Sequence, residues 1–334
     1  MGDATAPAAP ASTAPAPPPI DICNLDEAEY QALYKTRIEP VFQANEADRL
    51  AAIQTLKSRG VIGGVAALIV AVVVWQIASG SFMAGAIALL FAGLLAYAWA
   101  AAPLMAVGKR VKQSYCDGIA QAMGAIYKMG DFAPPAFDRL KEWRLVPDYS
   151  RSHFEDWFAG AYKGSSYDLY EAHLEQRHTD SKGRTYYSTV FRGQLIRMHF
   201  PRDFLGVTVV RRDMGVFNVF GGQSGLERVG LEDPVFEKAF EVWGSDQVEA
   251  RYLLHPALMQ RLLDLETRMK GQKLRCAFQG GDLLVAIEGG NRFEAGDLFK
   301  ALDDPERARR IVDDIASVMR VMDEAISAQS RRGA

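Results

Sequence analysis

The hydrophobic pattern of the chain changes character at residue 60. Between Gly60 and Gly108, 49 consecutive residues include no Asp, Glu, Lys, Arg or His, although charged residues make up 24% of the chain. A helix that is apolar on every side is typical of a lipid environment, and one crossing of a bilayer takes roughly 20 residues. The run therefore predicts two membrane-spanning helices, over 61–77 and 82–106, joined by a short uncharged turn.

Amphipathic segments flank this run on both sides. Apolar residues recur at helical spacing over 33–56 and 111–126, which predicts two helices that leave the membrane side by side and pair as a stalk. Helices lying on the lipid headgroups are the rival interpretation, which their mixed charge disfavours. Asn24 with Glu27 predicts the start of the first helix, and a bend is expected at Pro40.

From Ser165 onward the pattern has the period of β-strands. Strands are predicted over 165–177, 185–200, 205–211, 216–220 and 226–231. The clearest hairpin has Gly280–Gly281 as its turn, and alternation places Cys276 on the inner face of its first strand.

Two amphipathic helices complete the pattern. One begins at Pro256, and the last is expected to be capped by Asp304, with an apolar stripe that needs a sheet to cover. The predicted fold class is α+β: a two-helix transmembrane hairpin followed by a soluble, mainly antiparallel sheet with packed helices. The expected division is a disordered Ala/Pro tail (1–22), a juxtamembrane amphipathic helix (23–59), the hairpin (60–108), a helical stalk (109–145) and a cytosolic α+β domain (146–328).

Charge at the ends of the hairpin predicts its orientation. Basic residues stand before the first span and after the second, whereas the turn carries none; they are Arg49, Lys57, Arg59, Lys109, Arg110 and Lys112. The positive-inside rule then places both termini in the cytoplasm and the turn on the opposite side. A multi-pass protein of a cytoplasmic membrane is expected. No ionisable residue lies within the spans, which disfavours a channel or pump.

The search for catalytic chemistry yields no constellation. His173 and His178 lie five apart on a predicted strand, so they point to opposite faces and suit no shared metal ion. Ser224 sits in a sequence similar to a nucleophile elbow, but Leu226 occupies the place of the second glycine. Cys23, Cys116 and Cys276 fit no metal spacing, and a cytosolic setting predicts no disulfide.

Charge also argues against nucleic acid as a partner. The net charge is −3, and the basic residues are interspersed with acids, so no basic footprint is present. Arg307, Arg309 and Arg310 are interpreted as a solvated helix face rather than an anion site. The sequence thus predicts no catalytic residue, no cofactor and no metal ion, and leaves the lipid bilayer as the expected partner, with a protein partner or self-association through the hairpin or stalk as further options.

Several short segments resemble a known family. Gly160-Ala161-Tyr162-Lys163-Gly164, Val190–Leu195, Leu231-Glu232-Asp233-Pro234 and 246–254 together resemble the bacterial membrane-protein family called domain of unknown function 3137. The resemblance covers most of residues 25–290. It implies two membrane helices before a soluble domain, in a bacterial inner membrane, and it brings no established activity or site residues.

Physical interpretation accounts for most of those segments. Phe236 and Phe240 are expected in the core, and Asp246 is placed to cap a short helix. A ligand site involving Glu249, Arg251 or Tyr252 is an alternative.

Two functional hypotheses follow. The first is a non-enzymatic, membrane-anchored cytosolic module that binds a partner, as a scaffold or regulator. The second is a membrane-associated enzyme acting on lipid or envelope precursors, with catalytic groups gathered from distant strands. A deep cleft holding convergent titratable groups favours the second.

Overall fold

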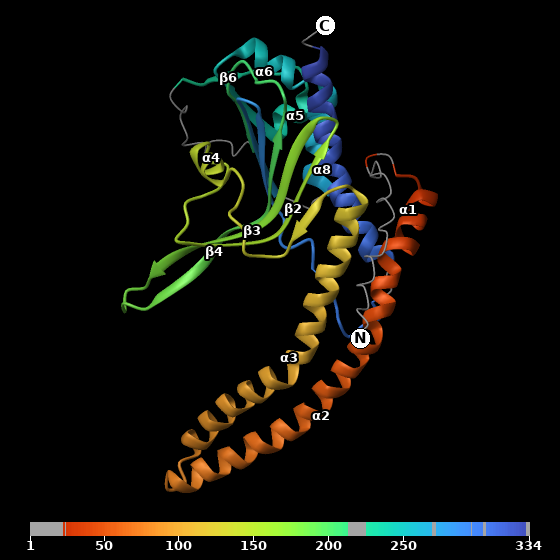
Figure 1. Ribbon diagram of the computed structural model, residues 1–334. Helices are drawn as coiled ribbons and strands as arrows, with labels where there is room; N and C mark the ends of the chain where they lie inside the picture. The colour runs from red at the N-terminus through yellow and green to blue at the C-terminus, as the bar shows by residue number, and fades with distance from the viewer. Residues whose placement is uncertain are drawn as a thin grey trace, which may run out of the picture.

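The computed structural model describes residues 23, 25–212, 225–268, 272–294, 296–302 and 305–331. The tail over 1–22, the strand predicted over 216–220, Ser224 and the cap at Asp304 lie outside the described residues. For the described chain, the α+β prediction is confirmed. Two long helices near the N-terminus precede a mainly antiparallel sheet with packed helices (Figure 1).

The first helical segment is continuous from the start of α1 to the end of α2. It comprises α1 (Glu27–Leu33), a π-helical turn η2 (Tyr34–Ile38) and α2 (Glu39–Ile77). Asp26 caps α1 and Glu29 completes a capping box, so the cap lies two residues beyond the position predicted at Asn24. The expected bend at Pro40 takes the form of the wide turn η2 just before it, because proline lacks the N–H of a regular turn.

α3 (Phe82–Ala122) returns antiparallel to α2 after the turn at residues 78–81. The two helices pack closely where small residues face each other. A Cβ atom built on Gly63 would lie 2.7 Å from the Cβ of Ala96, closer than real side chains approach. Small residues at this contact let the two helix backbones approach closely.

Within the described residues, the sheet has nine strands in the order β1-β2-β3-β4-β9-β8-β5-β7-β6, and their pairings are antiparallel. Its strands are β1 (Ile126–Lys128), β2 (Arg151–Tyr162), β3 (Ser165–Thr179), β4 (Thr185–His199), β5 (Thr208–Arg212), β6 (Glu227–Val229), β7 (Phe240–Gly244), β8 (Gln272–Gln279) and β9 (Asp282–Glu288). The hairpin β8–β9 turns at Gly280 and buries Cys276, as predicted.

The sheet separates two cores. One face packs against α7 (Pro256–Arg268), α8 (Pro305–Arg331) and the domain-side ends of α1 to α3. The other face is covered in part by α4 (Phe137–Glu142) and the segment after it. Two short helices, α5 (Pro234–Ala239) and α6 (Gln247–Leu253), flank β7; Asp246 caps α6, as predicted, and Phe236 and Phe240 are buried.

The sequence patterns missed β1, β2 and β7, and β1 lies within the stalk (109–145) that was expected to be helical. In β2 the side chains of alternate positions are only partly buried, and residues 155–158 contain a bulge, so the period of two is interrupted. β7 directly follows α5, and Phe240 is both the end of that helix and the start of the strand. In α3, the residues beyond 106 join the core of the domain through Val111, Tyr115 and Ile119.

Candidate functional site

A basic cavity lies on the sheet face that carries α4. Its volume is about 720 Å³, within the range of small-molecule sites. Six of its twelve lining residues are basic and two are acidic. The basic residues are Lys141, Arg144, Arg211, Arg212, Lys273 and Arg275, and the acidic residues are Asp148 and Glu241.

Strand alternation places two arginines on the floor of this cavity. β5 and β8 pair in the register Val209–Ala277 and Val210–Cys276, so Arg211 stands opposite Arg275 one step further. Val209 and Ala277 belong to the core on the α4 face, and the arginines, two positions along, project to that same face. Like charges directly opposite each other destabilise a strand pair. This pair therefore costs stability unless other groups balance the charge.

The segment after α4 forms the wall of the cavity. Arg211 donates to the carbonyl of Trp143 at 2.8 Å, and Arg275 donates to the carbonyl of Leu145 at 2.8 Å. These bonds tie the wall to the floor. Arg144, between the two acceptors, has a left-handed backbone with φ of 50° and an exposed side chain.

Two carboxylates near the floor pair with the basic residues of the cavity. Glu288 accepts from Arg275 at 2.8 Å and lies 3.5 Å from the ammonium of Lys273, so one acid serves two cations. Arg212 pairs with Glu266 at 2.5 Å. Burial, together with the positive charges of Arg144 and Arg275, lowers the pKa of Arg211. The cavity thus has a positive floor suited to an anion.

A second concentration of charge lies on the opposite face, where α3 meets β2. The ammonium of Lys112 is 2.7 Å from Asp156, 3.4 Å from Glu294 and 3.7 Å from Glu155. Tyr127 donates to Asp156 at 2.5 Å. Asp156 occupies the bulge of β2 with φ of 59°, which turns its side chain toward α3.

Glu171 completes this buried cluster. Its Oε1 atom accepts from the Gln194 amide at 3.0 Å and from the Arg292 N–H at 2.5 Å. Burial raises the pKa of Glu171 to about 8, so this carboxyl is protonated at neutral pH. Burial also raises the pKa of Asp156 to about 6 against the opposing effect of Lys112. Burial alone would lower the pKa of Lys112, but Asp156 raises it, and the ion pair persists at pH 7.

The donor set of Glu155, Asp156 and Glu171 was tested as a metal site. One oxygen from each lies within 4.8 Å of the others, and carboxylate oxygens suit Mg²⁺ or Ca²⁺. However, the ammonium of Lys112 already provides a cation to Glu155 and Asp156, and Glu171 is neutral at pH 7. These residues are better explained as a link between α3 and the sheet than as metal ligands.

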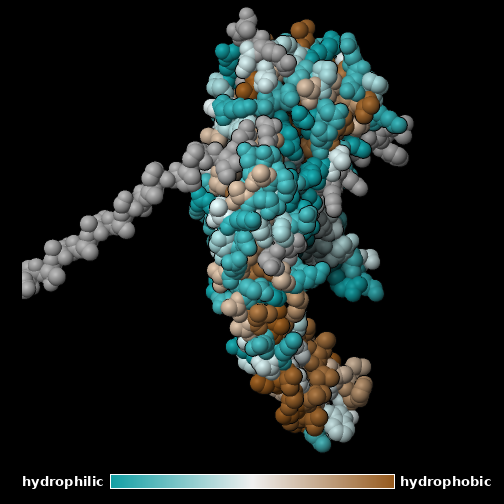
Figure 2. All heavy atoms as spheres, turned by 90° about the vertical axis from the view of Figure 1, so that its right-hand side faces the viewer, coloured by the Kyte–Doolittle hydropathy of each residue, from teal (hydrophilic) through white to brown (hydrophobic). Residues whose placement is uncertain are grey.

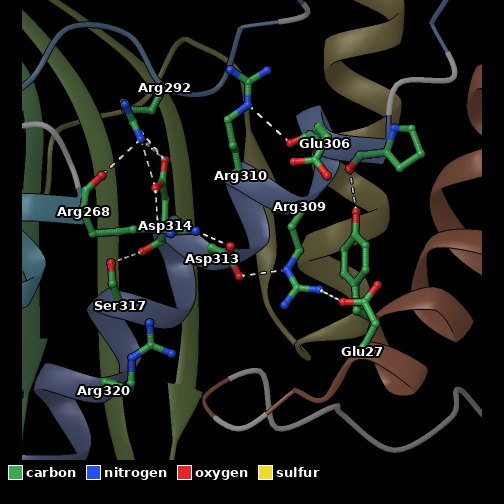
Figure 3. A network of polar contacts seen from close by, with 12 residues as sticks. Glu27, Arg268, Arg292, Glu306, Arg309, Arg310, Asp313, Asp314, Ser317 and Arg320 are labelled. Atoms are coloured by element: carbon green, nitrogen blue, oxygen red, sulfur yellow. Dashed lines mark hydrogen bonds and ion pairs between the residues drawn. The ribbon is translucent and has the colours of Figure 1, made fainter.

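A third network joins α8 to its neighbours (Figure 3). Arg292 and Asp314 form an ion pair at 2.8 Å, while Arg309 pairs with Glu27 at 2.7 Å and with Asp313 at 3.2 Å. A small cavity of about 300 Å³ lies beside Arg292 and Asp314. Because these contacts connect α8 with α1 and with the segment after β9, the network serves packing.

The residues considered in the sequence are dispersed in the structure. His173 and His178 contact Thr189 and Ser188 on β4, at 2.8 Å and 2.7 Å respectively. Arg309 packs over the ring of Tyr30, and its neighbour Arg310 lines the small cavity.

The three polar residues of α6 have separate contacts. Glu249 is buried and accepts from the N–H of Leu205, Arg251 donates to the carbonyl of Gly230, and Tyr252 donates to the carbonyl of Ala328. The structure thus does not bring Glu249, Arg251 and Tyr252 together around one ligand.

Residues 189–325 match the family model described as "Protein of unknown function (DUF3137)". Over these residues, which are less than half of the chain, the sequence is similar to that family. The resemblance found in the sequence is thereby confirmed, and three of its segments, 190–195, 231–234 and 246–254, lie inside the match. The family match contains the cavity floor, Arg211 and Arg275, whereas the wall from α4 lies before it.

No curated protein matches the chain. Among solved structures, the crystal structure of the mycobacterial trehalose monomycolate transport factor A, TtfA, is similar at 14% identity and a TM-score of 0.30. The similarity covers 60% of this chain and 90% of that chain. A likeness of this size indicates nothing about function here.

Neither charged site was found from the sequence. The cavity residues come from α4, the segment after it and three strands that are distant in the chain. One signal was present: two short strands carry four cations, Arg211, Arg212, Lys273 and Arg275. For the buried cluster, no signal distinguished Lys112 from the neighbouring Lys109 and Arg110.

Proposed function

We propose that this protein is a membrane-anchored binding module, with its hairpin crossing a bacterial inner membrane and both termini in the cytoplasm. The observation that carries the proposal is the division of α2 and α3 into two parts. Near the turn, large apolar side chains are exposed, among them Val61 at 70%, Phe82 at 83% and Leu95 at 73%. Figure 2 shows an apolar region at the end of the hairpin, away from the more polar domain.

Helix length and composition support the same proposal. Both helical segments contain an apolar window long enough to cross a membrane, and only 17% and 6% of those windows are buried inside the protein. A core helix of a soluble protein would be mostly buried. Exposed apolar area of this extent is unfavourable in water and favourable in lipid.

Four of the six basic flanking residues support the proposed orientation. Lys57, Arg59, Lys109 and Arg110 remain accessible at the base of the hairpin, where they can face cytoplasmic headgroups. Arg49 and Lys112 are instead buried in contacts with the domain.

The experiment is extraction and topology mapping of the intact chain. We expect alkaline carbonate to leave the protein in membranes of the producing bacterium. A reporter that is active only outside the cytoplasm should give a signal when it is fused after Ser79. A reporter that is active only inside the cytoplasm should give a signal when it is fused to the C-terminus. Release by carbonate would refute the anchor, and an external C-terminus would refute the orientation.

A second candidate, an enzyme acting on lipid or envelope precursors, is favoured by one observation. The raised pKa values of Asp156 and Glu171 are of the kind found at functional sites. Under this alternative, Asp156→Asn and Glu171→Gln abolish function while leaving the protein folded and in the membrane. Under the binding proposal, both folded variants keep their function, because the two carboxyls serve only the packing of α3 on the sheet.

A further inference from the structure

The cavity on the α4 face is a binding site whose ligand class follows from its charge, its size and its position. This inference deepens the proposed function, because it names the ligand of the same binding module. It draws on residues that neither the hairpin nor the buried cluster around Lys112 uses.

The positive charge of the residues that line the cavity favours an anionic ligand. Arg211 and Arg275 stand opposite each other on the floor, and Lys273, Arg144 and Lys141 surround them. Like charges on paired strands repel each other, and the carboxylate beside Arg275, Glu288, is shared with Lys273. A ligand anion between the two guanidinium groups relieves this repulsion and accepts charge-assisted hydrogen bonds from both.

The volume of the cavity favours an organic anion with more than one charged group. A volume of about 720 Å³ greatly exceeds the ~30 Å³ occupied by one water molecule, so a single inorganic phosphate leaves most of the cavity unfilled. The cations extend from the floor to the rim, over β5, β8 and the segment after α4. A diphosphate spans such a distribution better than a single charge does. Trp243 and Tyr149 add aromatic surface for the organic part of the ligand.

The position of the cavity relative to the hairpin favours a soluble ligand over a lipid headgroup. Beyond residue 106, α3 continues to Ala122, roughly 24 Å at 1.5 Å per residue. The sheet begins only after this extension, and α4 lies far from the hairpin turn (Figure 1). With the hairpin in a bilayer, the cavity therefore stands clear of the headgroups of that membrane.

We propose that the cavity formed by α4, β5, β7 and β8 binds a soluble organic diphosphate, held between Arg211 and Arg275. The test uses the full chain purified in neutral detergent, so that it does not depend on the membrane anchor. Isothermal titration with ADP and with inorganic pyrophosphate is expected to show saturable binding by the natural chain.

Variants locate the site. Arg211→Gln is expected to weaken binding of both probes at least tenfold. Arg144→Gln and Lys273→Gln, which change exposed rim residues, are expected to weaken it severalfold while the protein stays folded. Arg261→Gln on α7 is the matched control, because it removes a partly exposed arginine from the opposite face, and its affinity should equal that of the natural chain.

Each alternative outcome contradicts the proposal. Absence of saturable binding, or equal binding by all variants, shows that the cavity is not a diphosphate site. Binding to phosphatidylglycerol vesicles but not to ADP or pyrophosphate, with sensitivity to Arg144→Gln, assigns the site to a lipid headgroup. Should Arg211→Gln fail to fold, the two rim variants decide alone. Carbonate release tests the membrane anchor separately, so failure of one idea is distinguishable from failure of the other.

Discussion

The two halves of α2 and α3 share a backbone and differ in their surroundings. Near the turn, the large apolar side chains of both helices are exposed. Toward the domain, α3 is buried at Val111, Tyr115 and Ile119 and carries one charged residue, Lys112, into the core. The domain half is amphipathic, with apolar residues buried and polar residues exposed, whereas the half near the turn is apolar on every side. The difference lies in whether charges are absent, as near the turn, or paired, as in the domain.

The continuity of the helices has a mechanical consequence. Because α3 runs unbroken from the apolar end into the core, no flexible linker separates the hairpin from the sheet. Lys112 and Arg49 fasten the helices to the domain, the first to Asp156 and the second to the carbonyl of Leu298 at 3.0 Å. A domain attached in this way is held at a fixed height and orientation relative to the hairpin, as suits a scaffold.

Loss of the buried ammonium should have the largest effect on the domain half. Lys112→Met leaves Asp156 buried without its cation, and breaking a buried pair costs about 3–5 kcal/mol. We expect a fall of this size in the free energy of unfolding, measured by denaturant titration of the protein in detergent. Lys109→Met is the matched control, since Lys109 is exposed on the same helix and should change stability little.

The double variant Lys112→Met with Asp156→Asn refines this prediction. Removing both charges should recover much of the lost stability, because an uncompensated carboxylate no longer remains. If Lys112→Met and Lys109→Met are equally stable, the buried ion pair does not fasten α3 to the sheet.

The protonation of Glu171 makes the domain half sensitive to pH. Its pKa rises from 4.5 unfolded to about 8 folded, so the folded state binds the extra proton between these values. The free energy of unfolding should therefore fall as pH rises from about 4.5 to 8. At 1.36 kcal/mol per pKa unit, the loss by pH 7 is about 3 kcal/mol.

Glu171→Gln tests whether the free energy of unfolding falls as the pH rises. The variant should be more stable than the natural chain at pH 7 and should lose most of the pH dependence, leaving the smaller decline below pH 6 that Asp156 contributes. Glu175→Gln, at a partly exposed position on the same strand, is the control and should keep the decline between pH 4.5 and 8. A natural chain whose stability rises between pH 5 and 8 would contradict the raised pKa of Glu171.

The half of α2 and α3 near the turn and the half toward the domain also differ in how far the sequence could predict them. The hairpin was predictable because its signal, the absence of charge, is local and uninterrupted. The β8–β9 hairpin and the inward side of Cys276 followed from alternation and a Gly-Gly turn. In contrast, the role of Lys112 depends on a bulge in β2, more than 40 residues later. Arg211 and Arg275 meet only because β5 pairs with β8, a register that no local pattern specifies.

A bulky residue in the contact between the spans should affect the hairpin half alone. In Gly63→Leu the new side chain meets the backbone and Cβ of Ala96, and overpacking of this kind costs typically 1–3 kcal/mol. Gly64→Leu is the matched control, because no atom lies within 4 Å of the position of its Cβ. Stability measured by titration with sodium dodecyl sulfate should fall in the first variant and not in the second. Equal stability of both variants would show that α2 and α3 do not pack through Gly63.

The smallest effect is expected at the boundary between the halves. The guanidinium of Arg59 lies 4.8 Å from the ring centre of Trp99 and donates to the carbonyl of that residue at 3.4 Å. Such a cation–π contact contributes about 0.5–1 kcal/mol at an exposed site. Arg59→Gln should lower stability in detergent by this amount, whereas Lys57→Gln, at an exposed position on the same helix, should not. In a bilayer the same change should cost more than in detergent, because Arg59 would also lose its contact with anionic headgroups; an equal cost in both would place Arg59 outside the membrane interface.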